Sequence, residues 1–290
     1  MSAPAPPTAE TGGDDNDGPL AIIAGSGALP WEAAVAIAPR RKVLVFAIEG
    51  EADAARDGIE THVLGYGQIG KLGKMMRARG ARDLLFLGAI RSRPDYTRVL
   101  GDFDTLRLVP KIVRAAIGGD DTIVRNVLAL FESEGYRIVS VAEAVPELLA
   151  KPGVMTRRGP AGQHSDDIAL GHSFLDAAAR FDIGQAAVVA DGRIIAVEGA
   201  EGTDAMVARC ADLRKQKRFR AKRGAGVLVK RAKTGQDMRA DVPVVGAQTL
   251  RGVVAAGLGG IAIQAGHTIV AERDELIRIA DKEGAFVVAL

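Results

Sequence analysis

The chain has 290 residues, of which 48% are hydrophobic and 26% charged, and its formal net charge is +2. This composition is typical of a globular protein with one large or two ordinary domains, and we expect two. The nearly balanced charge gives no indication of nucleic-acid binding. Cys210 is the single cysteine, which excludes an intramolecular disulfide. Without a secretory signal or an apolar run of membrane length, the sequence predicts a cytoplasmic protein.

The first half alternates between predicted strands and helices. Residues 1–18 are rich in Ala, Pro, Gly and Asp and predict a disordered tail. The apolar runs that follow predict strands at 20–24, 42–48, 62–64, 83–88 and 136–139, and the periodic segments predict helices at 30–38, 68–79, 106–116, 122–133 and 142–149. This alternation indicates an open, mostly parallel sheet, and therefore a Rossmann-like domain over residues 19–150.

The second half has a different pattern. Two prolines and three glycines in residues 151–163 predict a linker. Ser165 and Asp166 are suited to cap a helix that runs to about residue 181. Asp191-Gly192 between two apolar runs predicts a two-residue hairpin. A hairpin among further strands and helices indicates a mixed α/β domain over residues 164–290.

Two glycine-rich turns in the first half are candidate phosphate loops. Gly25, Ser26 and Gly27 follow the first predicted strand, where backbone N–H groups can approach a phosphate. The third glycine of a dinucleotide fingerprint would fall at Pro30, which disfavours a nicotinamide-dependent oxidoreductase. A tight turn without a ligand explains these glycines nearly as well. Residues 65–71 have phosphate-loop spacing, but Leu72 stands where a magnesium-binding hydroxyl is needed, so a plain helix start is favoured.

The most polar segment follows a predicted strand at 226–229. Lys230, Lys233, Asp237, Arg239 and Asp241 all lie within 14 residues, together with an amide. Such groups are costly to desolvate beside a buried strand unless charged ligands bind between them. A metal ion would compensate the carboxylates, and a phosphorylated ligand would compensate the lysines and the arginine. The four histidines are scattered, which favours an oxygen-bound ion such as Mg²⁺. The alternative is a set of structural ion pairs among these acids and bases.

A second acidic site lies at a strand-to-helix junction. Thr203 or Asp204 is suited to cap the helix, but capping does not explain Glu201. The basic run at residues 214–223 is either a solvated helix end or a patch that faces anionic phosphates.

Together these stretches closely resemble the LpxI family of UDP-2,3-diacylglucosamine pyrophosphatases of lipid A biosynthesis. The resemblance extends from about Leu20 to the C-terminus. The matching pieces lie at residues 23–30, 68–72, 119–121, 156–158, 182–185, 198–206, 226–230, 236–243 and 255–261. Thr234 departs from the proline that we expect in the family pattern, which affects the stiffness of the loop more than its chemistry.

The resemblance implies a lipid-linked UDP-sugar substrate held between a Rossmann-like N-terminal domain and a distinct C-terminal domain. Water would attack the pyrophosphate with Mg²⁺ assistance, at the β-phosphorus, and release UMP and 2,3-diacylglucosamine 1-phosphate (lipid X). We expect Asp237 to be the central catalytic carboxylate, and we nominate Asp237, Asp241 and Asp204 as metal ligands. The expected substrate-binding residues are Gly25, Ser26, Gly27, Gly88, Arg157, Gln185, Glu201, Gly202, Thr203, Asp204, Lys230 and Lys233.

Two further expectations concern partners and the competing class of function. The acyl chains of such a substrate favour peripheral contact with the inner membrane through apolar helix faces and the basic run. Neither a nucleic acid nor an obligate protein partner is expected. The competing class is a non-catalytic sensor that binds a nucleotide or lipid phosphate with the same residues.

Overall fold

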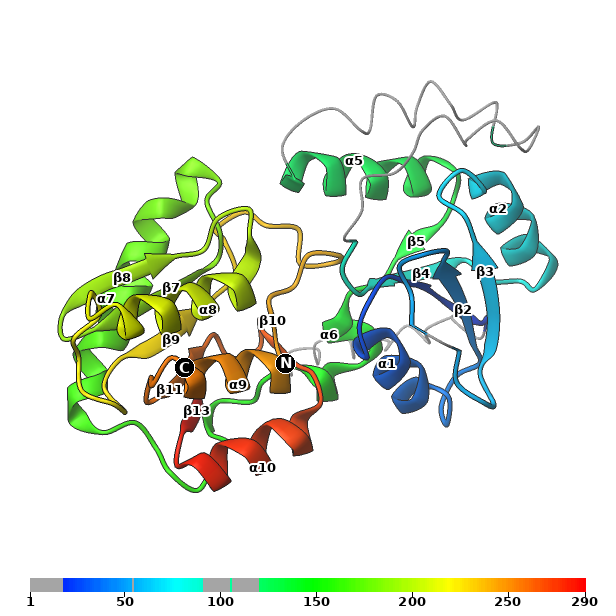
Figure 1. Cartoon of the computed structure of the whole chain (residues 1–290). Helices are drawn as coiled ribbons and strands as arrows, with labels where there is room; N and C mark the ends of the chain where they lie inside the picture. Colours follow the sequence, from blue (N-terminus) through cyan, green and yellow to red (C-terminus); the bar gives the residue numbers. More distant parts are fainter. Residues whose placement is uncertain (1–17, 54, 91–104, 106–119) are drawn as a thin grey trace, which may run out of the picture.

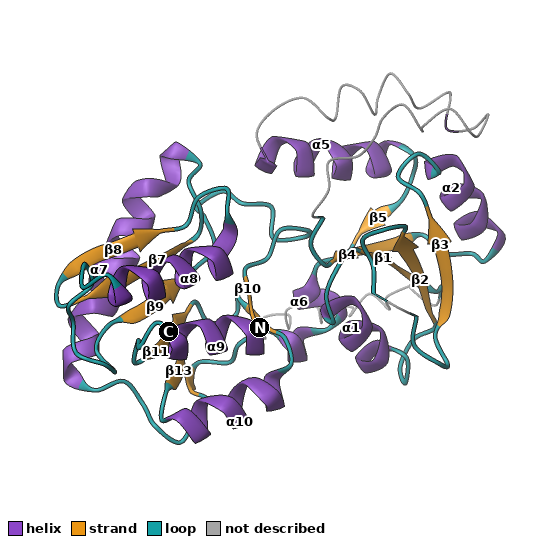
Figure 2. Cartoon of the chain, in the orientation of Figure 1, coloured by secondary structure: helices purple, strands orange, loops and turns teal. Residues whose placement is uncertain are grey.

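Two α/β sheets, one in each half of the chain, form the framework of the protein (Figure 1). The computed structural model describes residues 18–53, 55–90, 105 and 120–290. The predicted tail, except Gly18, and the predicted helix at 106–116 lie outside the described residues. Figure 2 shows strands at the centre of each half with helices on both sides, so the predicted α/β class with two distinct domains is confirmed.

Among the residues that the structure describes, the N-terminal sheet has five strands in the order β3-β2-β1-β4-β5. All of its pairings are parallel, as expected for a Rossmann-like domain. Because both faces are covered, the central strands are continuous apolar runs. The strands are β1 (Leu20–Ala24), β2 (Val43–Ile48), β3 (Glu60–Leu64), β4 (Asp83–Leu87) and β5 (Arg137–Ile138).

Helices cover both faces of this sheet (Figure 1). On one face, Trp31 of α1 packs in a core cluster with Ile22 of β1. On the other face, Phe131 of α5 packs in a cluster with the neighbouring strand residue Ala21, because successive side chains of a strand point to opposite faces. The helical elements are α1 (Leu29–Ile37), α2 (Ile69–Ala78), α5 (Asp120–Ser133), α6 (Val141–Ala144) and η2 (Pro146–Leu148).

The C-terminal sheet is mixed, as predicted. Its six strands have the order β6-β13-β11-β9-β7-β8, and the three central strands β9, β11 and β13 are parallel. The hairpin prediction is also confirmed, since Asp191 and Gly192 adopt φ values of 50° and 70° between β7 and β8. The strands are β6 (Gly153–Val154), β7 (Ala186–Ala190), β8 (Arg193–Val197), β9 (Val227–Lys230), β11 (Gly260–Ile263) and β13 (Phe286–Ala289).

The helices of this half divide between the two faces of the sheet. Met206, Leu250 and Leu276 bring three helices onto one face, and Ile168 packs α7 onto the other. The helical elements are α7 (Gly162–Ala178), η3 (Ala179–Phe181), α8 (Gly202–Lys215), α9 (Ala247–Ala255) and α10 (Arg273–Glu283).

The start of α7 differs from the prediction. The helix begins at Gly162, and the ring Nδ1 of His164 accepts a hydrogen bond of 3.0 Å from the backbone N–H of Ala161. The expected caps Ser165 and Asp166 therefore lie inside the helix, so that expectation is wrong. A buried histidine ring, which the sequence pattern does not reveal, closes the helix end instead.

A small sheet connects the two domains. Strands β10 (Val244–Val245) and β12 (Ile269–Val270) pair in parallel, and Ile269 packs in the same core cluster as Leu20 of the N-terminal sheet. The backbone N–H of Glu272 donates to the carboxylate of Glu32 in α1. Residues predicted as a linker also contribute β6, which pairs antiparallel with β13. The domains are thus packed against each other by apolar and polar contacts.

Candidate functional site

The carboxyl ends of the parallel strands in the C-terminal sheet meet at one edge. Lys230 ends β9, and the register pairs it with Ile263 at the end of β11, which pairs with Ala289 at the end of β13. Because β7 is antiparallel to β9, its first residue Ala186 lies at the same edge. Ligands of α/β proteins commonly bind outside the carboxyl ends of strands. This edge of the sheet is therefore the expected position of a ligand site.

A buried chain of polar groups lies at this edge. Lys230 is only 6% exposed, and its Nζ donates a hydrogen bond to Thr203 Oγ1 at 2.8 Å. Thr203 Oγ1 donates to Glu198 Oε1 at 2.6 Å. The other oxygen of Glu198 accepts from the backbone N–H of Gln185 at 2.9 Å. Four residues from three parts of the sequence thus form one hydrogen-bonded network, which we call the Lys230 network.

Three carboxylates compensate the buried ammonium. Burial lowers the pKa of Lys230, because a charged group is poorly solvated there, whereas Glu198, Asp204 and Asp241 oppose this effect electrostatically. Asp204 is itself fixed, since its Oδ1 accepts from Thr249 Oγ1 at 2.7 Å. The structure therefore gathers two of the nominated metal ligands around a lysine.

Asp237 lies in a second charged cluster. Its carboxylate accepts from Nε and Nη2 of Arg239 at 2.9 and 2.7 Å, and from the backbone N–H of Arg239 at 3.1 Å. Nη1 of Arg239 donates to Glu132 of α5 at 2.5 Å. The hydrogen bonds from Arg239 hold the pKa of Asp237 below its ordinary value, so the carboxylate is charged at neutral pH. We call these three residues the Asp237 cluster.

The loop that carries Asp237 lies at the boundary of the two domains. On the C-terminal side, Lys233 Nζ donates to Asp182 at 2.8 Å and Gln236 Nε2 donates to Gln185 Oε1 at 3.4 Å. On the N-terminal side, Arg239 reaches α5 and Ala240 packs against the core cluster of α2 and α5. In Figure 1 this gold-coloured loop runs from the C-terminal half to the N-terminal half. The nominated catalytic carboxylate thus lies where both domains contribute side chains.

The glycines of the N-terminal domain have a structural reason for their presence. A Cβ on Gly25 would approach Ala89 O to 2.6 Å, and a Cβ on Gly88 would approach Gly25 C to 2.7 Å. Ser26 Oγ donates to Ala89 O at 2.8 Å, which ties the ends of β1 and β4 together. Gly27 has a φ of 98° and open space around it. Close backbone packing therefore accounts for Gly25 and Gly88, whereas the positive φ of the turn, and no close contact, accounts for Gly27.

Among the nominated residues of the C-terminal half, Arg157 and Glu201 lie outside the Lys230 network and make other contacts. Arg157 follows β6 beside the amino end of β13, which is the edge opposite Lys230, and its side chain is 88% exposed. Glu201 lies at the start of α8 but points to solvent, where its carboxylate pairs with Arg209 at 2.8 Å. Gly202 beside it adopts a φ of 79° at the helix start. Of these residues, only Gly202 remains next to the network, through Thr203.

The basic run at residues 214–223 is partly structural. Arg214 donates to three backbone carbonyls, including Ala256 at 2.6 Å and Gly257 at 3.3 Å, and its guanidinium lies 4.0 Å from the ring centroid of Phe219. The run precedes β9, so it lies towards the end of that strand opposite Lys230. Exposed cations remain at Lys215, Lys217, Arg218, Arg220, Lys222 and Arg223.

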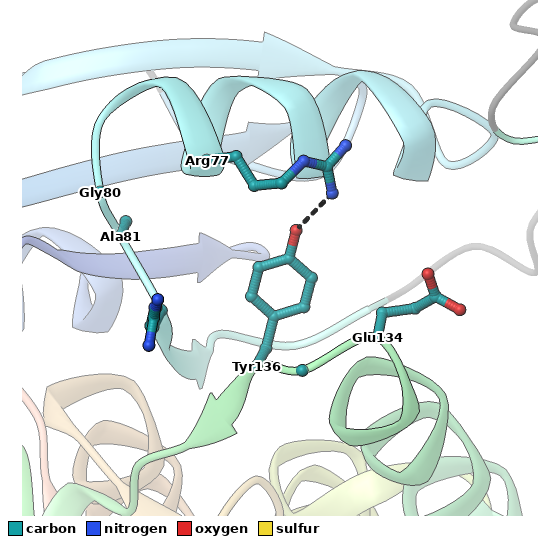
Figure 3. Close-up of a pocket in the computed structure, with 7 residues that line it drawn as sticks. Arg77, Gly80, Ala81, Glu134 and Tyr136 are labelled. Carbon is teal, nitrogen blue, oxygen red and sulfur yellow. Dashed lines mark hydrogen bonds between the residues drawn. The ribbon is translucent and has the colours of Figure 1, made fainter.

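A pocket of about 320 Å³ lies at the amino edge of the N-terminal sheet (Figure 3). Arg77, Glu134 and Tyr136 line it, and Arg77 Nη1 donates to the Tyr136 hydroxyl at 3.4 Å. It lies at the start of β4 and β5, whereas Gly88 follows the other end of β4. This pocket is therefore separate from the glycine turns. The segment at residues 65–71 with phosphate-loop spacing is the start of helix α2, as the sequence predicts, and the N–H of Gly70 donates to Thr105 Oγ1.

Glu198 is a buried polar residue of the site that the sequence did not single out. Its side chain, in a residue 7% exposed, links Thr203 to Gln185. The available signal was an acid directly after an apolar strand, followed by Gly199.

Within the described ranges, no group of three or more His, Cys, Asp or Glu side chains is arranged to hold a metal ion.

The fold and the site together define a two-domain α/β protein with acidic and basic side chains gathered at strand ends and at the domain boundary, as is typical of proteins that bind phosphorylated ligands. The family model of the LpxI N-terminal domain matches residues 19–148, and that of the LpxI C-terminal domain matches residues 151–288. The chain belongs to the LpxI family. It is 39% identical over 272 residues to the UDP-2,3-diacylglucosamine pyrophosphatase LpxI of Caulobacter vibrioides. The aligned region covers 93% of this chain and 97% of that protein. The resemblance drawn from the sequence is thereby confirmed.

Proposed function

We propose that this protein hydrolyses the pyrophosphate bond of UDP-2,3-diacylglucosamine and releases UMP and 2,3-diacylglucosamine 1-phosphate. The observation that carries the proposal is the similarity to the Caulobacter enzyme, which extends through both domains. The charged clusters support it, because a diphosphate needs cationic partners such as Lys230, Lys233 and Arg239. We place the substrate at the domain boundary, beside the loop that carries Asp237.

We further propose that Mg²⁺ binds together with the substrate and not in a cage made by the protein alone. Magnesium is commonly held by one or two carboxylates plus substrate phosphates, so the described residues suit this mode although they form no three-ligand group. Asp237 is the nominated ligand, with Asp204 and Asp241 as secondary candidates. The ion would supply charge neutralisation on the diphosphate oxygens and on the leaving phosphate.

The residues of the chain suggest how the site is prepared. Asp237 is ionised at neutral pH, so it is suited to hold a cation or to orient water, and not to donate a proton. Its present partner Arg239 is 40% exposed and can turn from a carboxylate to a phosphate, which offers the same bidentate geometry. Binding of the substrate would then exchange the partners of both residues. Attack at the β-phosphorus remains part of the proposal on the strength of the family resemblance.

Contact with a membrane surface also remains a proposal. In the part of the chain that the structure describes, no helix is long and apolar enough to cross a bilayer. The exposed cations of the basic run suit the headgroups of anionic lipids. Sedimentation with anionic and neutral vesicles at low and physiological salt tests this proposal, and failure to bind anionic vesicles at both salt concentrations would refute it.

The competing proposal is a sensor that binds the same lipid nucleotide without cleaving it. Incubation of the purified protein with UDP-2,3-diacylglucosamine and Mg²⁺, followed by detection of UMP, separates the two functions. Release of UMP that depends on protein and on Mg²⁺ supports the enzyme. Tight binding without any UMP supports the sensor.

A further inference from the structure

The buried ammonium of Lys230 has unused hydrogen-bonding capacity. An ammonium carries three donors. Among the described residues, Lys230 Nζ donates only to Thr203 Oγ1, although the residue is only 6% exposed. Burying a charged group is costly unless its donors are satisfied, which favours an anionic ligand as the further acceptor. The position of the residue at the carboxyl end of β9 is consistent with such a ligand.

The direction of the hydrogen bonds identifies what fixes this ammonium. Because a charged lysine only donates, the oxygen of Thr203 must accept from it, and the single hydroxyl proton of Thr203 is then directed to Glu198. Glu198 cannot rotate freely, since its second oxygen accepts from the N–H of Gln185. The carboxylate therefore sets the rotamer of Thr203, which in turn sets the position of Nζ.

The backbone at Gly184 packs closely against Glu198. A Cβ at position 184 would lie 2.5 Å from both Cβ and the carbonyl oxygen of Glu198, so only glycine fits there. The N–H of Gly184 donates to Glu198 O at 3.0 Å, and the N–H of Glu198 donates to Ala186 O at 2.9 Å. These bonds hold Glu198 beyond the end of β8, against the first residue of β7.

We propose that Glu198 is a positioning residue, which orients Lys230 through Thr203 so that the ammonium binds a phosphate oxygen of the substrate. This inference rests on the proposed function for the identity of the ligand. Asp204 and Asp241 also lie near the ammonium and contribute negative charge, but the hydrogen-bonded connection runs through Glu198. Glu198 does not touch the ligand; it acts through Thr203.

A matched control is available at the other end of the same hairpin. Asp167 is 3% exposed, and its carboxylate accepts from the N–H groups of Asp191 and Gly192 at 3.2 and 2.8 Å. Like Glu198, Asp167 is therefore a buried carboxylate that accepts hydrogen bonds from backbone N–H groups. A change at Asp167 reports what the loss of such a carboxylate costs in stability, at a point remote from Lys230.

The experiment compares Glu198→Gln and Asp167→Asn with the wild type in thermal unfolding, in substrate binding in detergent micelles, and in release of UMP. We expect both variants to unfold at a lower temperature. Glu198→Gln should also bind substrate on the order of 10-fold more weakly and raise KM more than it lowers kcat, because a charge-assisted phosphate contact is misplaced. Asp167→Asn should keep wild-type binding. Equal binding by folded Glu198→Gln and wild type, or equal losses in both variants, would overturn the proposal.

A second pair of variants protects the test against misfolding. Thr203→Val keeps the shape of the side chain but removes the hydroxyl, whereas Thr203→Ser keeps the hydroxyl. The Ser variant should bind substrate several-fold more tightly than the Val variant, and equal affinities would refute the connection through Thr203. Because binding is measured apart from hydrolysis, wild-type binding without UMP would refute the proposed enzyme while this inference is still decided by the variants.

Discussion

Replacement of Asp237 by asparagine distinguishes two roles of this side chain, that of a catalytic carboxylate and that of one half of a structural ion pair. The side chain of Asp237 is 18% exposed and that of its partner Arg239 is 40% exposed, so the pair is intermediate between a surface and a buried salt bridge. Asparagine keeps one oxygen that can accept from Arg239. We therefore expect a loss in the free energy of unfolding of about 1 kcal/mol. Such a loss lowers the melting temperature by about 2–4 °C.

The expected loss of activity is much larger than this loss of stability. A protein with ordinary stability that loses about 1 kcal/mol remains almost entirely folded at 25 °C. Removal of a carboxylate that holds the metal ion or orients water should lower kcat by roughly 10²–10⁴-fold, which corresponds to about 3–5 kcal/mol of transition-state stabilisation. UMP release measured beside thermal unfolding gives both quantities for the same preparation.

Glu132→Gln is the matched control for this prediction. Glu132 binds the other side of the same guanidinium but belongs to α5 and has no proposed role in the reaction. This variant should show a similar small loss of stability and keep kcat within a few-fold of the wild type. Turnover near the wild-type value in Asp237→Asn would refute the catalytic assignment. An equal loss in Glu132→Gln would show that the ion network, and not the carboxylate, is what matters.

Three further predictions concern pH, reactivity and packing. Arg239→Ala should destabilise the protein at pH 7, and this loss of stability should shrink as the pH falls below about 4. The reason is that a carboxylate with a lowered pKa contributes stability above its ordinary pKa of about 4 and loses it as the pH falls through the lowered value; a difference in urea unfolding that stays constant from pH 7 downwards would show that this is wrong. Burial raises the pKa of Cys210 to about 11, so its thiol should resist a disulfide reagent at pH 8 until urea unfolds the protein, and immediate labelling of the native protein would contradict this. Gly171→Ala should lower the free energy of unfolding by about 1–3 kcal/mol, since the new Cβ would lie 2.6 Å from a methyl of Val229. Gly162→Ala in the same helix meets open space and should leave the melting temperature unchanged or higher, so equal melting temperatures for both variants would refute the packing argument.

Much of the fold was predictable because its signals are local. The apolar run of β9 and the Asp191-Gly192 turn each depend on a few adjacent residues, whose burial and backbone preferences are properties of the sequence. The start of α7 was not predictable, because the group that closes it is the ring of His164, which is also held by the carbonyl of Gly224, 60 residues further along the chain.

The candidate site shows the same division. The sequence by itself determined the two α/β domains, the family, and the segment in which Lys230 and Asp237 lie. Only the tertiary structure decided their partners: it buried Lys230 against Thr203 and Glu198, and it joined Arg239 beside Asp237 to Glu132, which is 107 residues away. The physical reason is that periodicity and turn chemistry act between neighbours in the chain, whereas the pairing of charges depends on which strand ends and helices the fold brings within hydrogen-bonding distance.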